Sequence, residues 1–176
     1  MEGFQELFSG DLVRYGADDV DKWTRRFLYY FRKVSTCGNP FLLRYYEFRY
    51  NRICEKRGIE IPRIVEIGKG LYVGHFYNVT INPQAKLGQN INLHKGVTIG
   101  QESRGKRKGV PTIGNQVWIG TNAIIVGNIA IGDDVLIAPN AFVNFDVPSH
   151  SIVLGNPAKI IHRENATEGY INNPVS

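Results

Sequence analysis

From residue 113 onward, apolar side chains return at every sixth position of the chain. These positions are Ile113, Ile119, Ile125, Ile131, Ile137 and Val143, and all six are β-branched. The residues two places before them are apolar as well, so each hexad contains a short alternation with the period of a β-strand. A period of six fits no α-helix, and β-branched residues mixed with glycine and asparagine disfavour one. The segment therefore predicts a series of very short strands.

Turn-forming residues separate these short strands. The separating pairs are Asn115-Gln116, Thr121-Asn122, Gly127-Asn128, Asp133-Asp134 and Pro139-Asn140. Asparagine, aspartate and glycine are the residues that best tolerate a left-handed backbone conformation. Each hexad is therefore interpreted as a strand plus a corner. About three hexads would make one coil, and stacked coils would form a hexapeptide-repeat solenoid, a parallel β-helix with a narrow shared core.

The six-residue pattern extends upstream with one change of frame. Ile81, Leu87, Leu93 and Ile99 keep it, and Ile67, Val73 and Val79 keep it in a frame offset by two residues. The offset predicts a small insertion near residue 80. Between Ile99 and Ile113 the segment QESRGKRKGVP has no inward apolar set, so residues 101–110 are expected to form a loop excluded from the solenoid. The repeats span about residues 61–146, enough for four to five coils, within a β-helix domain of residues 59–163.

Residues 1–58 predict a small α-helical region. The segments DDVDKWTRRFLYYFRKV and NPFLLRYYEFRYNRICEKRG carry apolar residues at helical spacing. Asp18 or Asp19 is expected to cap the first helix, and the second is expected to begin after Asn39-Pro40 and end at Gly58. Because a solenoid end exposes unpaired backbone and apolar side chains, the helices are expected to pack against it. Residues 164–176 lack apolar periodicity and are expected to form a flexible or strand-swapped tail that touches a neighbouring subunit.

Composition and charge narrow the class of protein. The 176 residues contain no apolar run long enough to span a bilayer, and the first residues lack the pattern of a secretory signal, so we expect a soluble cytoplasmic protein. The two cysteines lack metal-ligand spacing, which suits a reducing compartment. The net charge of +5 is partly concentrated in the loop at Arg104, Lys106, Arg107 and Lys108. Without a nucleic-acid-binding module, this cluster favours solvent or a phosphorylated small molecule over nucleic acid.

The candidate chemistry rests on histidine. The chain has four histidines and no G-x-S-x-G nucleophile motif, which leaves a histidine acting as general base on a hydroxyl or an amine. His75, in GLYVGHFYN, lies two residues past the inward Val73, so we expect it at a corner or on the outer face. His94 directly follows the inward Leu93 and is expected to point outward, where it is a secondary candidate for contact with the acceptor substrate.

The segments PTIGNQVWIGTNAIIVGN and VPSHSIVLGNPAKII, the second ending in GNPAK at 155–159, resemble those of the hexapeptide-repeat acyltransferases. With the preceding helices, residues 40–163 are similar to serine O-acetyltransferase-like enzymes. The resemblance implies a left-handed parallel β-helix, a homotrimer with active sites between subunits, and acetyl-CoA as co-substrate without a metal. The family's catalytic histidine matches His75. The carboxylate that orients it stands fifteen residues earlier, where this chain has Glu60.

The resemblance also implies where acetyl-CoA would bind. The pantetheine arm would run along the repeats near Gly120, Ala123 and Ala138, while Lys159 and the basic loop are candidates for the CoA phosphates. The expected reaction is transfer of the acetyl group to a hydroxyl, with His75 taking the hydroxyl proton and Glu60 fixing the histidine tautomer.

Two departures from the family bear on the acceptor. The aspartate that directly precedes the catalytic histidine in the family is Gly74 here, and the family's Arg-His pair at the end of the extended loop aligns with Gly109-Val110. The groups that would hold the carboxylate and ammonium of serine are therefore missing. A sugar or polysaccharide hydroxyl is the favoured acceptor on this ground, and L-serine is the alternative.

Two other function classes remain open at the sequence level. Left-handed β-helices also include zinc carbonic anhydrases, and His75 and His94, nineteen residues apart, would approach each other if they lay on adjacent coils. A zinc site needs three protein ligands, however, and a third histidine at close spacing is missing. The other alternative is a non-catalytic trimeric scaffold.

Overall fold

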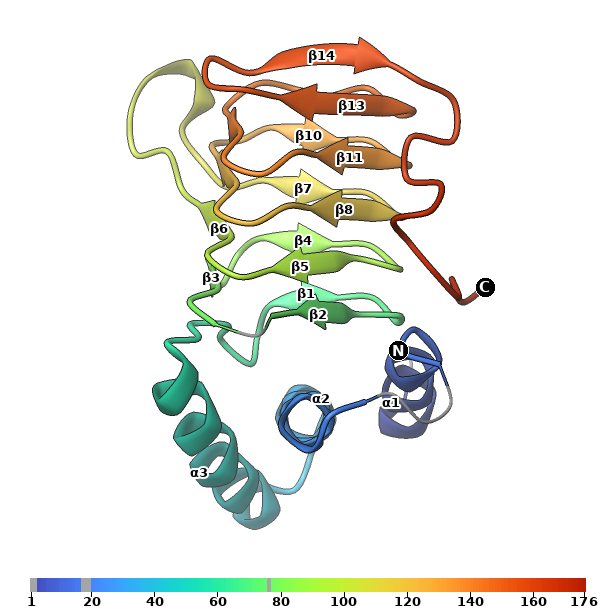
Figure 1. Ribbon diagram of the computed structural model, residues 1–176. Helices are drawn as coiled ribbons and strands as arrows, with labels where there is room; N and C mark the ends of the chain where they lie inside the picture. Colours follow the sequence, from blue (N-terminus) through green and yellow to red (C-terminus); the bar gives the residue numbers. More distant parts are fainter. Residues whose placement is uncertain (1–2, 17–19, 76) are drawn as a thin grey trace.

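The computed structural model describes residues 3–16, 20–75 and 77–176. In these residues, the helices α1 (Phe4–Val13), α2 (Lys22–Thr36) and α3 (Pro40–Arg57) precede fourteen strands and one short 3-10 helix, η1 (Gly105–Arg107). The strands stack in a column, and the helices lie beneath its N-terminal end (Figure 1). The architecture predicted from the hexad pattern is confirmed.

The strands form three parallel faces around one core. The first face contains β1 (Glu66–Ile67), β4 (Lys86–Leu87), β7 (Thr112–Ile113) and β10 (Ala130–Ile131). The second contains β2 (Tyr72–Gly74), β5 (Asn92–His94), β8 (Val117–Ile119), β11 (Val135–Ile137), β13 (Ser151–Leu154) and β14 (Lys159–His162). The third contains β3 (Thr80–Ile81), β6 (Thr98–Gly100), β9 (Ile124–Val126) and β12 (Phe142–Val143). Strands β1 to β12 make four coils of three strands each.

The six-residue pattern fills the core, and polar residues turn the corners. Ile119, Ile125 and Ile137 are fully buried in one continuous apolar cluster. Asn122 and Asn140 take up left-handed conformations at the equivalent corner of successive coils, with φ values of 59° at both positions. The strand-plus-corner interpretation of each hexad therefore holds, because the short strands leave no room for a wider turn.

One corner is longer than its equivalents. Five residues, 75–79, connect β2 to β3, whereas three residues, 95–97, connect β5 to β6 on the next coil. This corner contains the two-residue insertion that the change of frame predicts near residue 80. The flanking strands keep their register, with Val73 opposite Leu93 and Ile81 opposite Ile99, so the two extra residues are accommodated within this corner. His75 is the first residue of the corner.

The N-terminal helices satisfy the open end of the solenoid. Arg32 of α2 pairs with Asp11 of α1 at 2.7 Å, and both side chains are almost completely buried. Arg32 also donates hydrogen bonds to the carbonyls of Ile67 and Gly68, while Asp11 accepts one from the amide of Leu71. These are backbone groups of the first coil that have no coil below them. The helices therefore act as the expected cap, through buried charge as well as apolar packing.

The helix ends follow the sequence signals with one correction. Asn39 caps α3 and the left-handed Gly58 ends it, as expected. The N-cap of α2 is Asp21, whose carboxylate accepts hydrogen bonds from the amides of Trp23 and Thr24. Asp18 and Asp19, expected at this position, lie outside the described residues. No helix in the described ranges is long and apolar enough to cross a membrane, and the cytoplasmic location remains a prediction.

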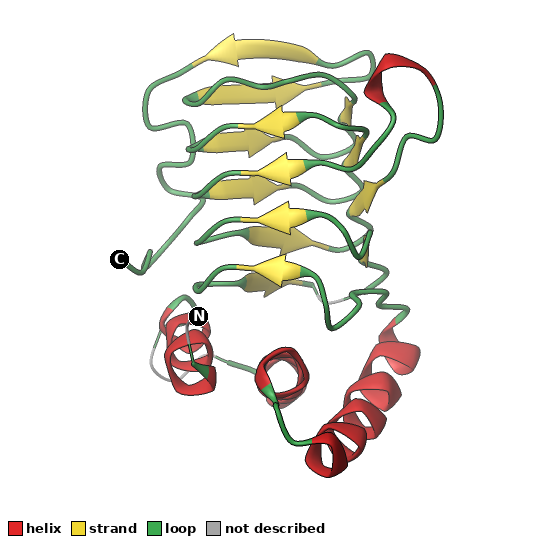
Figure 2. Ribbon diagram, turned by 180° about the vertical axis from the view of Figure 1, so that it is seen from behind, coloured by secondary structure: helices red, strands yellow, loops and turns green. Residues whose placement is uncertain are grey.

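The excluded loop folds back onto the solenoid. Glu102 and Gly109 exchange backbone hydrogen bonds at the base of the loop, and the carbonyl of Arg107 accepts one from Asn128 on the next coil. At the far end of the column, β14 pairs antiparallel with β13 and covers the last coil (Figure 2).

The C-terminal tail differs from the expectation. Instead of leaving the molecule, residues 164–176 run back along the chain's own solenoid and end beside α1 (Figure 1). The Asp134 carboxylate accepts hydrogen bonds from Ala166 and Thr167, and Asn90 exchanges two hydrogen bonds with the backbone of Val175. The tail is therefore not a free extension in this structure, because polar side chains of the solenoid fix its backbone. Exchange of the tail with a neighbouring subunit, or contact with one, stays a prediction.

Candidate active site

His75 occupies the long corner at the end of β2. Its backbone is left-handed, with φ 51°, and its side chain is exposed. The ring of His94, on β5 of the next coil, lies 6.4 Å from the His75 ring between centroids. The structure thus brings together the two histidines that the sequence analysis selected, through the parallel pairing of Gly74 with His94.

The glycine before His75 is explained by its neighbour. A Cβ atom at Gly74 would lie 2.9 Å from Cε1 and 3.0 Å from Nδ1 of His94. Real Cβ atoms rarely approach other atoms so closely, so the imidazole occupies the space that a side chain at position 74 would need. The absence of an aspartate at this position is therefore coupled to the presence of His94.

His94 is packed as a neutral imidazole. Its ring lies 4.7 Å from the Trp118 ring between centroids, and its Nε2 atom is buried without a hydrogen-bond partner among the described residues. Burial, and then the nearby His75, lower the pKa of His94, so the ring is uncharged at neutral pH. The described residues contain no group of three or more histidine, cysteine, aspartate or glutamate side chains able to hold a metal ion.

Glu60, expected to orient His75, lies on a different face. Its backbone extends the third face by pairing with Thr80, and its exposed side chain lines a cavity of about 300 Å³ beside α3, together with Glu47 and Arg63. No hydrogen bond or ion pair joins Glu60 to His75, both of which the structure describes. The carboxylate–histidine pair remains a prediction that needs a change in side-chain conformation.

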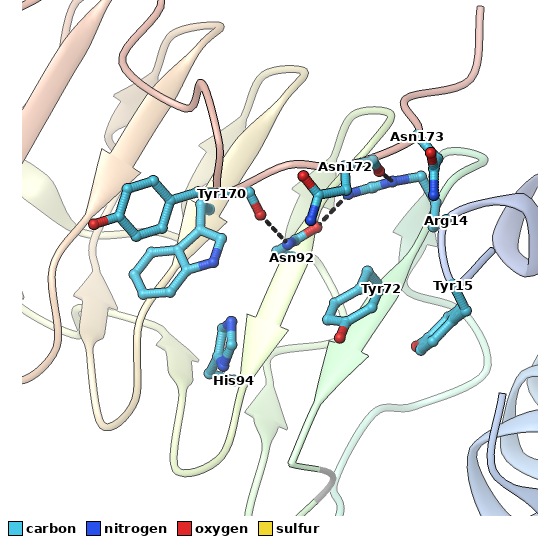
Figure 3. Close-up of a pocket in the computed structure, with 9 residues that line it drawn as sticks. Arg14, Tyr15, Tyr72, Asn92, His94, Tyr170, Asn172 and Asn173 are labelled. Atoms are coloured by element: carbon cyan, nitrogen blue, oxygen red, sulfur yellow. Dashed lines mark hydrogen bonds between the residues drawn. The ribbon is translucent and has the colours of Figure 1, made fainter. Parts of the chain in front are cut away.

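A pocket of about 440 Å³ opens on the outer surface of the second face, next to His94 (Figure 3). We call it the aromatic pocket. Its aromatic lining consists of Tyr15, Tyr72, Trp118 and Tyr170, and its polar lining consists of Arg14, Asn92, His94, Asn172 and Asn173. Sequence reasoning identified only His94 among these residues. The others come from the N-terminal region, three coils and the tail, so no local motif connects them.

Polar contacts fix the walls of the aromatic pocket. Arg14 donates hydrogen bonds to the carbonyls of Asn172 and Gly70 and to the side-chain oxygen of Asn92. The amide nitrogen of Asn92 in turn donates to the carbonyl of Tyr170 at 3.1 Å. Burial lowers the pKa of Arg14 to about 10, so it stays charged at neutral pH. Figure 3 shows the bonds that join Asn92 to Tyr170 and to Arg14, and Arg14 to Asn172.

The residues expected near the pantetheine arm differ in what they can offer. Ala123 is 0% exposed and its methyl group faces the core, so it has no side-chain surface for a ligand. A Cβ at Gly120 would lie 2.8 Å from the Trp118 ring, which shows that this indole leans over the glycine. Ala138 is half-buried, and Lys159 is exposed at the start of β14. The structure therefore leaves Ala138 and Lys159 as the accessible members of the set.

The basic loop forms a second candidate surface for acetyl-CoA. Arg104, Lys106 and Arg107 line a cavity of about 300 Å³ with Val126 and Asn144 of two successive coils, and the three cations outnumber its one carboxylate, that of Glu102. Guanidinium and ammonium groups are the usual protein partners of phosphate oxygens. The residues present thus fit a phosphorylated ligand.

Comparisons with known proteins agree with this architecture. The family described as "Bacterial transferase hexapeptide (six repeats)" matches residues 111–144. A serine acetyltransferase of Helicobacter pylori is 39% identical over 107 residues, which are 61% of this chain and 63% of that protein. Serine acetyltransferase 4 of Arabidopsis thaliana is 39% identical over 111 residues, which are 63% of this chain but 31% of that protein. The chain thus spans less than two thirds of the length of these relatives.

Solved structures extend the likeness to the helices. The soybean serine acetyltransferase apoenzyme superimposes with a TM-score of 0.75 at 25% identity, covering 90% of this chain and 69% of the other. The Neisseria gonorrhoeae serine acetyltransferase in complex with serine gives a TM-score of 0.69 at 30% identity, with the same coverage of 90% and 69%. These likenesses confirm the expected left-handed parallel β-helix with N-terminal helices. The chain therefore belongs to the serine acetyltransferase family of hexapeptide-repeat acyltransferases.

Proposed function

We propose that this chain is an acetyl-CoA-dependent O-acetyltransferase in which His75 is the general base. The observation that carries the proposal is the position of His75. It lies exposed on the one corner that is two residues longer than its equivalent on the next coil, in a chain whose relatives are named serine acetyltransferases. An imidazole held outside the core and open to ligands is suited to removing a hydroxyl proton.

The proposed step is a direct transfer. His75 takes the proton of the acceptor hydroxyl while that oxygen forms a bond to the thioester carbonyl carbon. The carbon–sulfur bond then breaks, and the imidazolium returns the proton to the departing thiolate. The products are an acetyl ester and free coenzyme A, and the enzyme ends in its starting protonation state.

Acetyl-CoA would be held by the accessible members of the expected set. Lys159 and the basic loop around Arg104 and Arg107 supply cations for the phosphates, and Ala138 offers a small surface for the pantetheine arm. The proposal retains the homotrimer expected from the family, with the active site completed between subunits. It also retains Glu60 as a positioning residue for His75.

The acceptor has two candidates. The names of the relatives point to L-serine, and the Neisseria gonorrhoeae structure is a complex with serine. Against this, Gly74 and Gly109-Val110 leave out side chains that the family resemblance assigns to serine. A sugar hydroxyl, favoured from the sequence, finds no support in those names. L-Serine is therefore the first acceptor to assay.

The experiment is release of free thiol from acetyl-CoA by the purified chain. L-Serine and a panel of sugars are offered separately, and the His75→Ala variant is run in parallel. Acceptor-dependent release that disappears in His75→Ala supports the proposal. Acceptor-dependent release that persists in His75→Ala contradicts the role of His75, and no release with any acceptor favours the scaffold alternative.

A further inference from the structure

We propose that the aromatic pocket is an acceptor subsite for a neutral, ring-shaped polyhydroxyl compound, such as a hexopyranoside. This inference rests on the proposed function and specifies the substrate class of the same site. Its first basis is position. His94 lines the pocket and its ring lies 6.4 Å from the His75 ring between centroids, so one imidazole separates the pocket from the proposed base.

The charge of the pocket selects a neutral ligand. Among the described residues that line it there is no carboxylate, so nothing in the lining would pair with the ammonium group of an amino acid. Arg14 is the one charged lining residue. Its three nitrogens each donate a hydrogen bond, to two backbone carbonyls and to Asn92, so the charge serves the protein's own structure.

The space around position 74 also leaves no room for the aspartate side chain that the family resemblance assigns to this position. His94 occupies the volume that a side chain at Gly74 would fill, at 2.9 Å from the hypothetical Cβ. The same histidine presents a buried Nε2 atom that has no partner among the described residues. Because this atom is buried beneath the pocket surface, it makes no contact with a ligand in the present conformation of the ring, and the contribution of His94 is to fill the space beside Gly74.

The lining of the pocket favours a ring. A volume of about 440 Å³ falls within the range of small-molecule sites and accommodates a pyranoside. Aromatic faces at Tyr72, Trp118 and Tyr170 offer stacking surfaces for the apolar faces of a sugar ring. The amide side chains of Asn172 and Asn173 offer donors and acceptors for its hydroxyls.

The pocket is built rather than incidental, because the tail that forms one wall is fixed at both ends. Near its start, Thr167 donates two hydrogen bonds to Asp134, from its amide at 3.0 Å and from its hydroxyl at 2.7 Å. Near its end, Val175 exchanges two hydrogen bonds with Asn90, each at 2.8 Å. Tyr170 and Asn172 between these points are tied to Asn92 and Arg14.

The test is a binding measurement that does not depend on turnover. The chain has two tryptophans, so Trp23→Phe leaves Trp118 as the single tryptophan, which is excited selectively over the nine tyrosines at the red edge of the absorption band. This protein is titrated with a panel of methyl hexopyranosides and methyl 2-acetamido-hexopyranosides, and separately with L-serine. We expect at least one glycoside to change the Trp118 emission with saturation and L-serine to leave it unchanged.

Variants in the same background locate the binding. Tyr72→Ala, on the strand, and Tyr170→Ala, on the exposed tail wall, are each expected to weaken glycoside binding at least tenfold. Tyr45→Ala, an exposed tyrosine on α3, is the matched control and should bind as the parent does. The proposal is overturned if no glycoside of the panel changes the emission, if L-serine alone does, or if glycoside binding is unaffected by both pocket variants.

Thiol release separates failure of this inference from failure of the proposed function. If L-serine supports turnover that requires His75 and no glycoside binds, the acetyltransferase proposal stands and the subsite is refuted. If a glycoside binds at Trp118 and no acceptor supports turnover, the pocket stands as a glycoside-binding site, whereas the acetyltransferase proposal and the role of the pocket as acceptor subsite are refuted.

Discussion

Replacing Gly74 by alanine tests whether His94 determines the residue at position 74. The backbone of Gly74 lies in strand β2 and is not left-handed, so alanine meets no conformational barrier there. In an isolated strand the change would even be favourable, because glycine inside a strand costs about 0.5–1 kcal/mol relative to alanine. The cost must therefore come from the contact of the new methyl group with the His94 ring.

The magnitude follows from the distances. The new Cβ would lie 2.9 Å and 3.0 Å from two ring atoms of His94 and 3.3 Å from the Tyr72 ring. Overpacking of this kind typically destabilises a protein by about 1–3 kcal/mol. In a His94→Ala background the ring is gone, and Gly74→Ala should be neutral or stabilising by up to about 0.5 kcal/mol. The expected coupling between the two positions is therefore about 1–3 kcal/mol.

Urea unfolding of the parent, both single variants and the double variant measures this coupling. The free energies are comparable if the dependence on urea concentration is the same for all four proteins. Equal costs for Gly74→Ala with and without the His94 ring would refute the steric explanation. The glycine would then need a different cause.

Three further predictions concern the cap, the neutral histidine and the tail. Arg32→Met should lower the free energy of unfolding by about 3–5 kcal/mol, because it leaves Asp11 buried without its partner. Arg63→Met, in an exposed ion pair, should lower it by at most about 1 kcal/mol. Similar losses for the two variants in urea unfolding would contradict the role of the buried pair in the N-terminal cap. The folded-state pKa of His94 lies below its unfolded value of about 6.5, so the unfolded chain binds a proton more readily than the folded one. The parent should therefore lose stability relative to His94→Gln as the pH falls below about 6.5. Parallel pH profiles of the melting temperature for the two proteins would contradict this. Asp134→Ala should leave tail amides unpaired at a cost of about 1–3 kcal/mol and speed cleavage after Tyr170 of the tail by chymotrypsin. An unchanged cleavage rate would show that other contacts hold the tail.

The sequence predicted the solenoid because its core has a strict period. Ile119, Ile125 and Ile137 belong to the six-residue series, and the structure buries all three completely. The same periodicity revealed the insertion that holds His75, since two extra residues shift the frame between Val79 and Ile81. The pattern can be recognised in the sequence because every coil places an apolar residue at the same core position.

The tail and the aromatic pocket have no such pattern. The tail is held by bonds from Asn90 and Asp134 to backbone groups, and a backbone group leaves no trace in the sequence. The pocket assembles Arg14, Trp118 and Tyr170 from distant segments, so their proximity depends on the fold. The expected partner of His75, Glu60, was placed by family spacing alone, and its side chain lies on another face of the coil.

The central claim is that His75 removes the proton of the acceptor hydroxyl. The most direct measurement is kcat/KM for acetyl transfer to the acceptor that gives the highest rate, in the parent, His75→Ala and His162→Ala. His162 is an exposed histidine of β14 and serves as the matched control. Loss of a general base typically costs about 10²–10⁴-fold, so the account predicts that loss for His75→Ala and an unchanged rate for His162→Ala. A His75→Ala variant within a factor of about two of the parent would contradict it.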